Sequence, residues 1–324
     1  MALNRIIGVP LILFAGCDAP APAPAPTTGV RIAFNVLVDR AADNYDIFVM
    51  DMDGKNARNI TNTPGVEWVY HASGEKLYFL SDRDTCHRCY FLYEMDASGA
   101  NVRRVFNARL QDSYMGSRMN GTELLIDPAG IRDTAFFRID RSGQVLDTLY
   151  HGLGYANDVS FSPDGKRFVF RGSHAKFKPD LGFIDELFLM DVDGANLRQL
   201  THYPANDTTA DWFLYHAGEP RWYVSRAGEE RISFISFRKG NHSIFSIRPD
   251  GSDERQETAD GFDEDWHDWS PDGRYLVYDG TPLTKEEERP VYDIHLMDVH
   301  TGQVTRLSTD TLTEQAPVFV EAPK

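Results

Sequence analysis

The chain has 324 residues and a formal net charge of −16, with 42% hydrophobic and 12% aromatic residues. This acidic balance argues against nucleic-acid binding, because a phosphate backbone requires a Lys/Arg footprint. No apolar run reaches the roughly 18 residues of a membrane-spanning helix, so none is predicted.

The first residues are typical of an export signal. Residues 1–16 combine a basic start, a short apolar stretch and a small pair, Ala15-Gly16. With Phe14 before it and Cys17 after it, this pair resembles the lipobox of bacterial lipoproteins. The resemblance implies cleavage before Cys17 and lipid attachment to its sulfur. The alternative is a plain secretory signal with an incidental cysteine.

Residues 17–29 are expected to separate this lipid from a folded domain. Alanine and proline alternate over residues 19–26. Alternating proline blocks helix and sheet and favours the stiff polyproline II conformation. The segment is therefore interpreted as a semi-rigid spacer that holds a domain away from a membrane surface.

The region 30–324 repeats one unit with two kinds of turn. The first turn is Ser-Pro-Asp-Gly at 162–165 and 270–273, with weaker copies expected at 72–74, 119–121 and 217–218. The second turn ends at a glycine in all six units: Gly54, Gly99, Gly143, Gly194, Gly251 and Gly302. Alternating strands flank these turns, as in hairpins. Four strands per unit describe a propeller blade, so six blades are predicted.

The two ends of this region complete one blade. Residues 30–34, 46–51 and 58–61 supply three strands, and 315–320 supplies the missing first strand. Such closure removes free sheet edges. The fold class is therefore all-β: a monomeric six-bladed β-propeller of four-stranded antiparallel blades, closed by the N- and C-terminal strands.

The repeat resembles that of the TolB-like propeller family. The motif of that family is carried here by residues 81–84, 190–194, 198–201 and 269–273. The resemblance covers residues 30–320 and implies the fold, but one fold hosts many functions. TolB itself has a further N-terminal domain, where this chain has the Ala-Pro spacer. A role in the Tol–Pal envelope system is therefore not implied.

Binding residues are expected on one face of the ring. The loops between blades and between the second and third strands share this face, and the tight turns occupy the other. Residues 172–185, 219–230 and 280–292 are long segments at or near the first face. Long loops on a rigid scaffold commonly carry function, although tolerated sequence drift is an alternative.

Acidic residues recur just before the first strand of each blade. They are Glu67, Asp112, Asp158, Asp211, Asp265 and Glu314. A carboxylate ring at the channel mouth would attract Ca²⁺ or the Lys/Arg side chains of a partner. Because the chain has 49 acidic residues, their chance placement in loops stays an alternative.

Two further motifs were weighed for chemistry. Trp266 and His267, in a dense polar cluster at 263–268, are further candidates for binding at the channel rim, although a lone histidine is more often structural than catalytic or metal-binding. Cys86 and Cys89 are three residues apart without a second pair, which is weak for zinc and favours a local disulfide in an oxidising compartment.

These observations favour a non-enzymatic lipoprotein of the bacterial cell envelope, on the periplasmic or cell-surface side. Its propeller face is expected to bind a protein or peptide partner, with membrane contact through the lipid alone. Two alternatives remain at this point. One is a carbohydrate-active hydrolase or lyase, which needs convergent catalytic groups in the channel mouth. The other is a module that binds a glycan or small molecule in an aromatic pocket.

Overall fold

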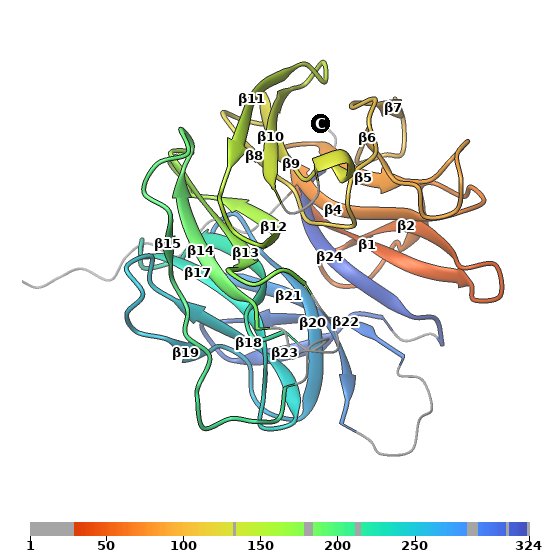
Figure 1. Cartoon of the computed structure of the whole chain (residues 1–324). Coiled ribbons are helices and arrows are strands. Elements are labelled where there is room, and N and C mark those ends of the chain that lie inside the picture. Colours follow the sequence, from red (N-terminus) through yellow and green to blue (C-terminus); the bar gives the residue numbers. More distant parts are fainter. Residues whose placement is uncertain are drawn as a thin grey trace, which may run out of the picture.

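The computed structural model describes residues 29–131, 134–177, 184–210, 215–283, 291–308 and 311–322. Over these ranges the chain forms six four-stranded antiparallel sheets that follow one another around a ring (Figure 1). The predicted all-β, six-bladed propeller is therefore confirmed. Within the same ranges, no helical segment has the length and hydrophobicity of a membrane span.

Blade one has the strand order β24-β1-β2-β3, and blades two to six each use four consecutive strands from β4 to β23. The inner strands are β24 (Glu314–Glu321), β4 (Glu67–Ser73), β8 (Gly116–Arg118), β12 (Tyr155–Phe161), β16 (Gly218–Val224) and β20 (Phe262–Trp269). The second strands are β1 (Val30–Asp39), β5 (Lys76–Ser81), β9 (Glu123–Ile126), β13 (Arg167–Ser173), β17 (Glu230–Arg238) and β21 (Tyr275–Pro282). The third strands are β2 (Asn44–Asp51), β6 (Phe91–Asp96), β10 (Ala135–Asp140), β14 (Glu186–Asp191), β18 (Asn241–Ile247) and β22 (Asp293–Asp298). The outer strands are β3 (Arg58–Asn59), β7 (Arg103–Arg104), β11 (Val145–Tyr150), β15 (Arg198–Gln199), β19 (Arg255–Gln256) and β23 (Gln303–Arg306). A short 3₁₀ turn, η1 (Ala129–Ile131), precedes β10.

The Ser-Pro-Asp-Gly turns are stabilised by their own side chains. In the turn between β12 and β13, Ser162 Oγ donates to Asp164 Oδ1 at 2.7 Å, and Gly165 N donates to Ser162 O at 2.8 Å. The turn between β20 and β21 repeats both contacts and ends at Gly273, whose φ is +64°. A Cβ at Gly273 would lie 2.1 Å from the Val224 carbonyl oxygen of blade five. Glycine is thus required both by the turn and by the neighbouring blade.

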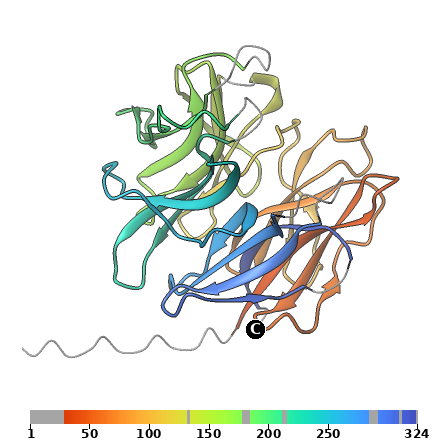
Figure 2. The ribbon, with the colours of Figure 1, turned by 90° about the horizontal axis from the view of Figure 1, so that it is seen from below.

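The ring is closed by strands from the two ends of the described chain. β24 pairs antiparallel with β1, from Val30 opposite Glu321 to Val36 opposite Glu314. Figure 2 shows the blue C-terminal strands beside the red and orange strands of the first blade. The predicted closure is confirmed, and β1 consequently has a strand partner on each side.

Apolar residues on both faces of each sheet hold neighbouring blades together. For example, Phe136 of blade three packs with Phe168 and Phe170 of blade four, and Phe34 of blade one packs with Val277 of blade six. Comparable clusters join the other neighbouring pairs of blades. Burial of this apolar surface is the main stabilising contribution, at about 25 cal/mol per Å².

Blade five corrects two details of the sequence interpretation. The pair Ala217-Gly218 was expected to be its first turn, but Gly218 begins β16. The turn instead lies at 225–228, where Gly228 N donates to Ser225 O at 2.8 Å. Residues 219–224 are therefore inner strand rather than part of a long loop. The pattern was misread because Gly218 sits beside a β-bulge, where glycine is as common as in turns.

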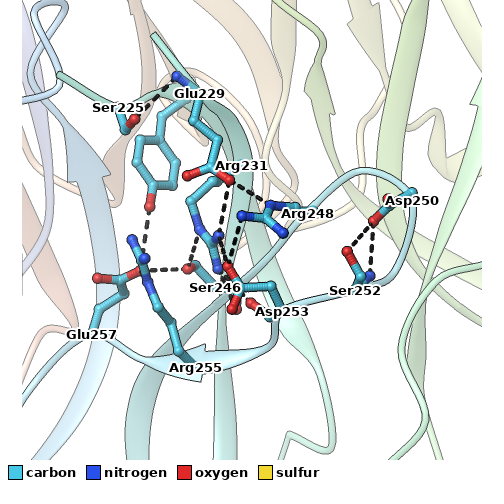
Figure 3. Close-up of polar contacts among 11 residues, drawn as sticks. Ser225, Glu229, Arg231, Ser246, Arg248, Asp250, Ser252, Asp253, Arg255 and Glu257 are labelled. Atoms are coloured by element: carbon cyan, nitrogen blue, oxygen red, sulfur yellow. Dashed lines mark hydrogen bonds and ion pairs between the residues drawn. The ribbon is translucent and has the colours of Figure 1, made fainter. Parts of the chain in front are cut away.

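A buried arginine ties together the outer part of blade five. Arg231 on β17 is fully buried, and its Nε donates to Ser246 Oγ at 2.8 Å. Its Nη atoms donate to Asp253 Oδ2 at 2.9 Å and Asp253 O at 2.6 Å. Glu229 and Arg248 extend these contacts at the surface (Figure 3). The turn between β18 and β19 is thus held by side chains rather than by a long strand.

Candidate functional site

A cavity of about 540 Å³ opens at the centre of the ring on the face that carries the tight turns. Its walls come from the last residues of the inner strands and the turns after them, including Ser73, Ser117, Asn120, Ser162 and Pro271. All six blades contribute to these walls, blade one through Val318 and Phe319 of β24. The cavity is therefore positioned by the rigid inner strands and not by long loops.

Arg221 forms the floor of this cavity. From β16 in blade five, its Nε donates to His267 O of blade six at 3.1 Å, and its Nη2 donates to Tyr70 O of blade two at 3.3 Å. Its guanidinium carbon lies 3.7 Å from the centre of the Tyr114 ring of blade three. Blades two and five stand opposite each other in the ring. This one side chain therefore crosses the channel and separates the cavity from the other half.

The walls of the cavity are polar, and their groups are paired with one another. His71 Nε2 and Ser117 Oγ share a hydrogen bond of 2.7 Å. Burial, together with the charge of Arg221, lowers the pKa of His71 to about 3, so the ring is neutral near pH 7. Arg118 donates to Glu123 Oε2 at 2.7 Å and to the Gly165 carbonyl at 2.9 Å. The cavity thus combines neutral hydrogen-bonding groups with charged ones: Arg118 and Asp164 lie in its wall, and the Arg221 guanidinium lies 3.7 Å from the Asp268 carboxylate.

The opposite half of the channel contains acidic residues placed by β-bulges. Register shifts in β12, β16 and β20 lie at Asp158, Glu219 and Asp265. Asp158 and Glu219 have positive φ values of 53° and 52°. A bulge re-aims the side chain at its position. Asp158 Oδ1 accepts from Tyr114 N at 2.9 Å, and its Oδ2 lies 3.2 Å from Arg171 Nε.

Three carboxyl groups in this half raise one another's pKa. Burial raises the pKa of Glu219 well above its usual range, and the charges of Asp265 and Asp158 add to this effect. Burial and the charge of Glu219 do the same to the pKa of Asp279 on β21. For Asp265, burial raises the pKa and the charge of Asp279 raises it further. Like charges in a low-dielectric site favour protonation, so these groups retain protons that exposed carboxyls release.

Among the other predicted rim residues that the structure describes, Glu67 and Glu314 begin inner strands, and Asp112 lies in the connection before β8. Glu67 begins β4, is buried, and its Oε2 accepts from Arg83 Nη2 at 2.7 Å. Its pKa is raised by burial and held down in part by Arg83. Asp112 accepts from the Tyr70 hydroxyl at 2.5 Å, and burial raises its pKa. Glu314 begins β24 and is buried, and its backbone N donates to Tyr292 O at 2.9 Å. Glu67 and Glu314 are therefore engaged inside the protein, whereas Asp112 is exposed as a residue and its carboxyl group bonds to Tyr70, so the three do not form an open ring.

Comparisons with known proteins agree with this architecture. TolB of Acinetobacter baumannii superposes with a TM-score of 0.66, at 19% identity, over 91% of this chain and 67% of that chain. The Tol-Pal system protein TolB of Wolinella succinogenes is 27% identical over 173 residues, or 53% of this chain. The chain is a TolB-like six-bladed β-propeller.

The likeness to curated sequences is partial. The Wolinella match covers 35% of that protein. The TolB of Anaeromyxobacter dehalogenans is 26% identical over 216 residues, which is 63% of this chain and 47% of that protein. The matched part of this TolB-like propeller thus spans less than half of these relatives. No family model matches the chain.

Trp266 and His267 are packed into the TolB-like ring. The Trp266 ring meets Trp68 of blade two edge-on, with centroids 5.6 Å apart. His267 is buried, and its Nε2 shares a hydrogen bond of 2.7 Å with Ser233 Oγ. Burial lowers the pKa of His267 well below its usual range, and the charge of Arg221 lowers it further. Both side chains therefore join blades, as the structural interpretation of the lone histidine expected.

Cys86 and Cys89 form a disulfide in the connection between β5 and β6. The residues between them contact the adjacent hairpin of blade one, where Arg88 Nε donates to Asp43 Oδ2 at 2.7 Å. His87 Nε2 lies 3.1 Å from the same carboxylate. The bridge therefore shapes a loop that docks on the neighbouring blade.

Cys17 and Asp211 lie outside the described residues. Glu219, Asp279 and Arg221 were not selected from the sequence, although the structure places them in the channel. Glu219 was missed because the first turn of blade five was assigned too early. Arg221 was missed because no pattern of neighbouring residues in the sequence indicates a contact across the ring. Among the residues that the structure describes, no three His, Cys, Asp or Glu side chains are grouped so that they could hold a metal ion.

Proposed function

We propose that this TolB-like propeller binds a protein or peptide partner in the bacterial cell envelope and catalyses no reaction. The observation that carries this proposal is the cavity of about 540 Å³ at the channel mouth. Its hydrogen-bonding groups and its charged side chains of both signs suit the polar backbone and side chains of a polypeptide. The relatives that are Tol-Pal system proteins support an envelope location and a protein partner.

The proposed binding face is the one that carries the tight turns. The sequence had favoured the opposite face, because its loops are longer. The cavity shifts the preference, since its walls need no rearrangement before a ligand enters, and preorganised sites lose less entropy on binding. The proposed anchor remains the lipid on Cys17, with residues 17–29 as the spacer.

Matched surface variants test the choice of face. Met119 and Leu283 are both exposed apolar residues, and they lie at the turn face and the loop face, respectively. Met119→Arg should reduce capture of the partner from detergent-solubilised envelopes, whereas Leu283→Arg should not. The opposite result would assign binding to the loop face. Equal capture by both variants and the parent protein would argue against either site.

The contact between His71 and Ser117 favours a hydrolase as the second candidate function, because a serine beside a histidine can act as a nucleophile. Against it, a conjugate-acid pKa of about 3 makes His71 a weak general base near neutral pH. Covalent labelling of Ser117 by a fluorophosphonate probe, lost in Ser117→Ala, would support the hydrolase and overturn the non-enzymatic proposal.

A Ca²⁺ ion at the rim also remains a proposal. Glu219, Asp265 and Asp279 carry oxygen atoms of the type that Ca²⁺ prefers, but the described side chains are not grouped as a metal site. An ion would therefore have to draw these carboxyl groups together and displace the protons that their raised pKa values retain. Millimolar Ca²⁺ should then raise the melting temperature more than NaCl at equal ionic strength, by the mass-action stabilisation of the folded state. The pair Glu219→Gln and Asp279→Asn should abolish the difference. Equal shifts with both salts in the parent protein would rule the ion out.

A further inference from the structure

Blade three ends in an outer strand unlike those of the other blades. β11 has six residues, whereas β3, β7, β15 and β19 have two each and β23 has four. β11 stands at the end of its sheet, and among the described residues its one strand partner is β10. Figure 1 shows it at the outer margin of the ring. Alternate backbone groups along such a strand point away from the sheet and can pair with another strand.

The side chains of this edge are apolar and exposed. Val145 is 40% exposed, Leu146 42% and Tyr150 66%. Natural edge strands are commonly short or carry lysine, proline or inward-pointing charges. β11 instead has one charged residue, Asp147, whose Oδ1 accepts from Thr148 N at 2.8 Å and whose Oδ2 lies 3.4 Å from Arg138 Nη2. The edge thus has an unusual length, an apolar surface and one half-exposed carboxylate.

A second cavity continues from the end of this strand. It has a volume of about 490 Å³, and Tyr150, Leu153 and Phe177 supply apolar walls. Gly152 also lines it, and nothing lies within 4 Å of the position where a Cβ would stand. The loop after β11 is ordered by His151, whose Nδ1 accepts from Leu153 N at 3.1 Å. Thr134 and Lys176 add polar groups to the same walls. An extended segment along β11 would therefore reach a preformed cavity with an apolar side formed by Tyr150, Leu153 and Phe177.

We propose that β11 binds an extended peptide segment of a cationic partner protein, which adds a fifth strand to blade three and places an apolar side chain in the cavity beside Tyr150. Backbone hydrogen bonds to the edge would provide affinity, and the cavity would set the register. Charge selects the partner: the chain carries −16, and a Lys or Arg opposite Asp147 forms a favourable cross-strand pair. A second copy of the chain is disfavoured by the same net charge.

This proposal is independent of the channel site. β11 contributes no residue to the turn-face cavity. A partner can therefore bind at the edge of blade three whether or not the channel mouth is occupied.

Direct titration with synthetic peptides tests the edge. The probe is fluorescein-labelled Ac-Val-Lys-Val-Lys-Val-Tyr-NH₂, followed by anisotropy with the intact protein. We expect saturable binding and slower hydrogen exchange at residues 145–150. Replacing both lysines by glutamate should weaken binding roughly ten-fold, because opposite charges are lost and like charges approach. A proline in place of the central valine should weaken it by a similar factor, because a backbone donor is removed.

Matched variants locate the site. Val145→Lys on β11 should weaken binding of the lysine-containing peptide. The control is Val304→Lys on β23, which replaces a valine of similar exposure, 44%, and should leave binding unchanged. Thr148→Pro alters the backbone of β11 without changing its charge, and it should also weaken binding of the peptide. Circular dichroism checks that this variant is folded. Absence of saturable binding, or equal loss with Val145→Lys and Val304→Lys, would overturn the proposal. A dimer in sedimentation that Val145→Lys dissociates would replace the peptide partner by a second copy.

Discussion

Blades three and five complete the same four-stranded plan in different ways. In blade three, β10 and β11 are both six residues long and pair along most of their length, and the inner strand β8 has only three residues. In blade five, the inner strand β16 has seven residues and the outer strand β19 has two. Its outer part is held by Arg231 and the residues around it (Figure 3).

The difference shows that the outer part of a blade can be stabilised by backbone pairing or by contacts between charged side chains. The short inner strand of blade three has a local cause, since Tyr114 N donates to Asp158 of blade four instead of to its own sheet. In blade three, backbone pairing leaves the long edge of β11 exposed. In blade five, the outer strand is short, and its position depends on charged side chains and on one buried guanidinium. The two blades should therefore respond differently to mutation and to pH.

The largest expected effect comes from opening the ring on which both blades depend. Deletion of residues 314–324 removes β24, with the buried Val318 and Val320. The loss of stability should exceed the roughly 0.5–3 kcal/mol of a typical substitution. Thermal unfolding followed by circular dichroism measures it. An unchanged melting temperature would contradict the closure, and blades three and five would then not depend on one closed ring.

Arg231→Met should destabilise the protein by roughly 1–3 kcal/mol, because it removes the hydrogen bonds of a fully buried guanidinium to Ser246 and to the partly exposed Asp253. Urea denaturation provides the measurement. Arg248→Met, which changes an exposed arginine of the same cluster, is the matched control and should have a much smaller effect. If the two variants were equally stable, the outer part of blade five would not be held by its buried charge.

The stability of the protein should fall as the pH rises from about 4.5 to about 8. Glu264 on β20 accepts from Ile244 N of blade five at 3.0 Å and from Thr258 Oγ, and burial raises its pKa from 4.5 to about 8. Below about pH 4.5 both the folded and the unfolded chain hold this proton. Above it the unfolded chain releases the proton first, which costs on the order of a few kcal/mol by pH 8.

Glu264→Gln should flatten this pH dependence in urea denaturation at pH 5 to 8. Hydrogen exchange, corrected for its intrinsic pH dependence, sharpens the contrast between the blades. Protection of β18 should fall with rising pH, whereas protection of β10 should change little. Equal changes in both strands would mean that the titrating groups act on the ring as a whole.

The smallest expected effect on stability comes from the free edge of blade three. Asp147→Val should change the free energy of unfolding by no more than about 0.5 kcal/mol, since this side chain is half-exposed. Its consequence should appear in sedimentation velocity as concentration-dependent association, because the edge loses its one charge. A variant that stays monomeric at high concentration would show that Asp147 does not protect the edge.

Local chemistry made much of the fold predictable from the sequence. The Ser-Pro-Asp-Gly turn at 162–165 and the glycine turns ending at Gly54 and Gly302 use contacts between residues within a few positions of one another. Such turns determine strand direction and mark each blade. Blade five was misassigned at Gly218, because glycine serves equally in a turn and beside a bulge, and only the pairing of β16 with β17 separates the two.

The sequence by itself determined the number of blades, the closing strand and the presence of acids before most inner strands. Repeats and turns can be recognised in this way because they depend on residues that are neighbours in the chain. Only the tertiary structure decided what those acids do. Asp158 pairs with Arg171, the charge of Glu219 raises the pKa of Asp279 in the neighbouring blade, and Arg221 crosses the channel to Tyr70. These contacts join residues up to 151 positions apart. Their geometry exists only once the ring has closed, because closure brings the inner strands of opposite blades within reach of one side chain.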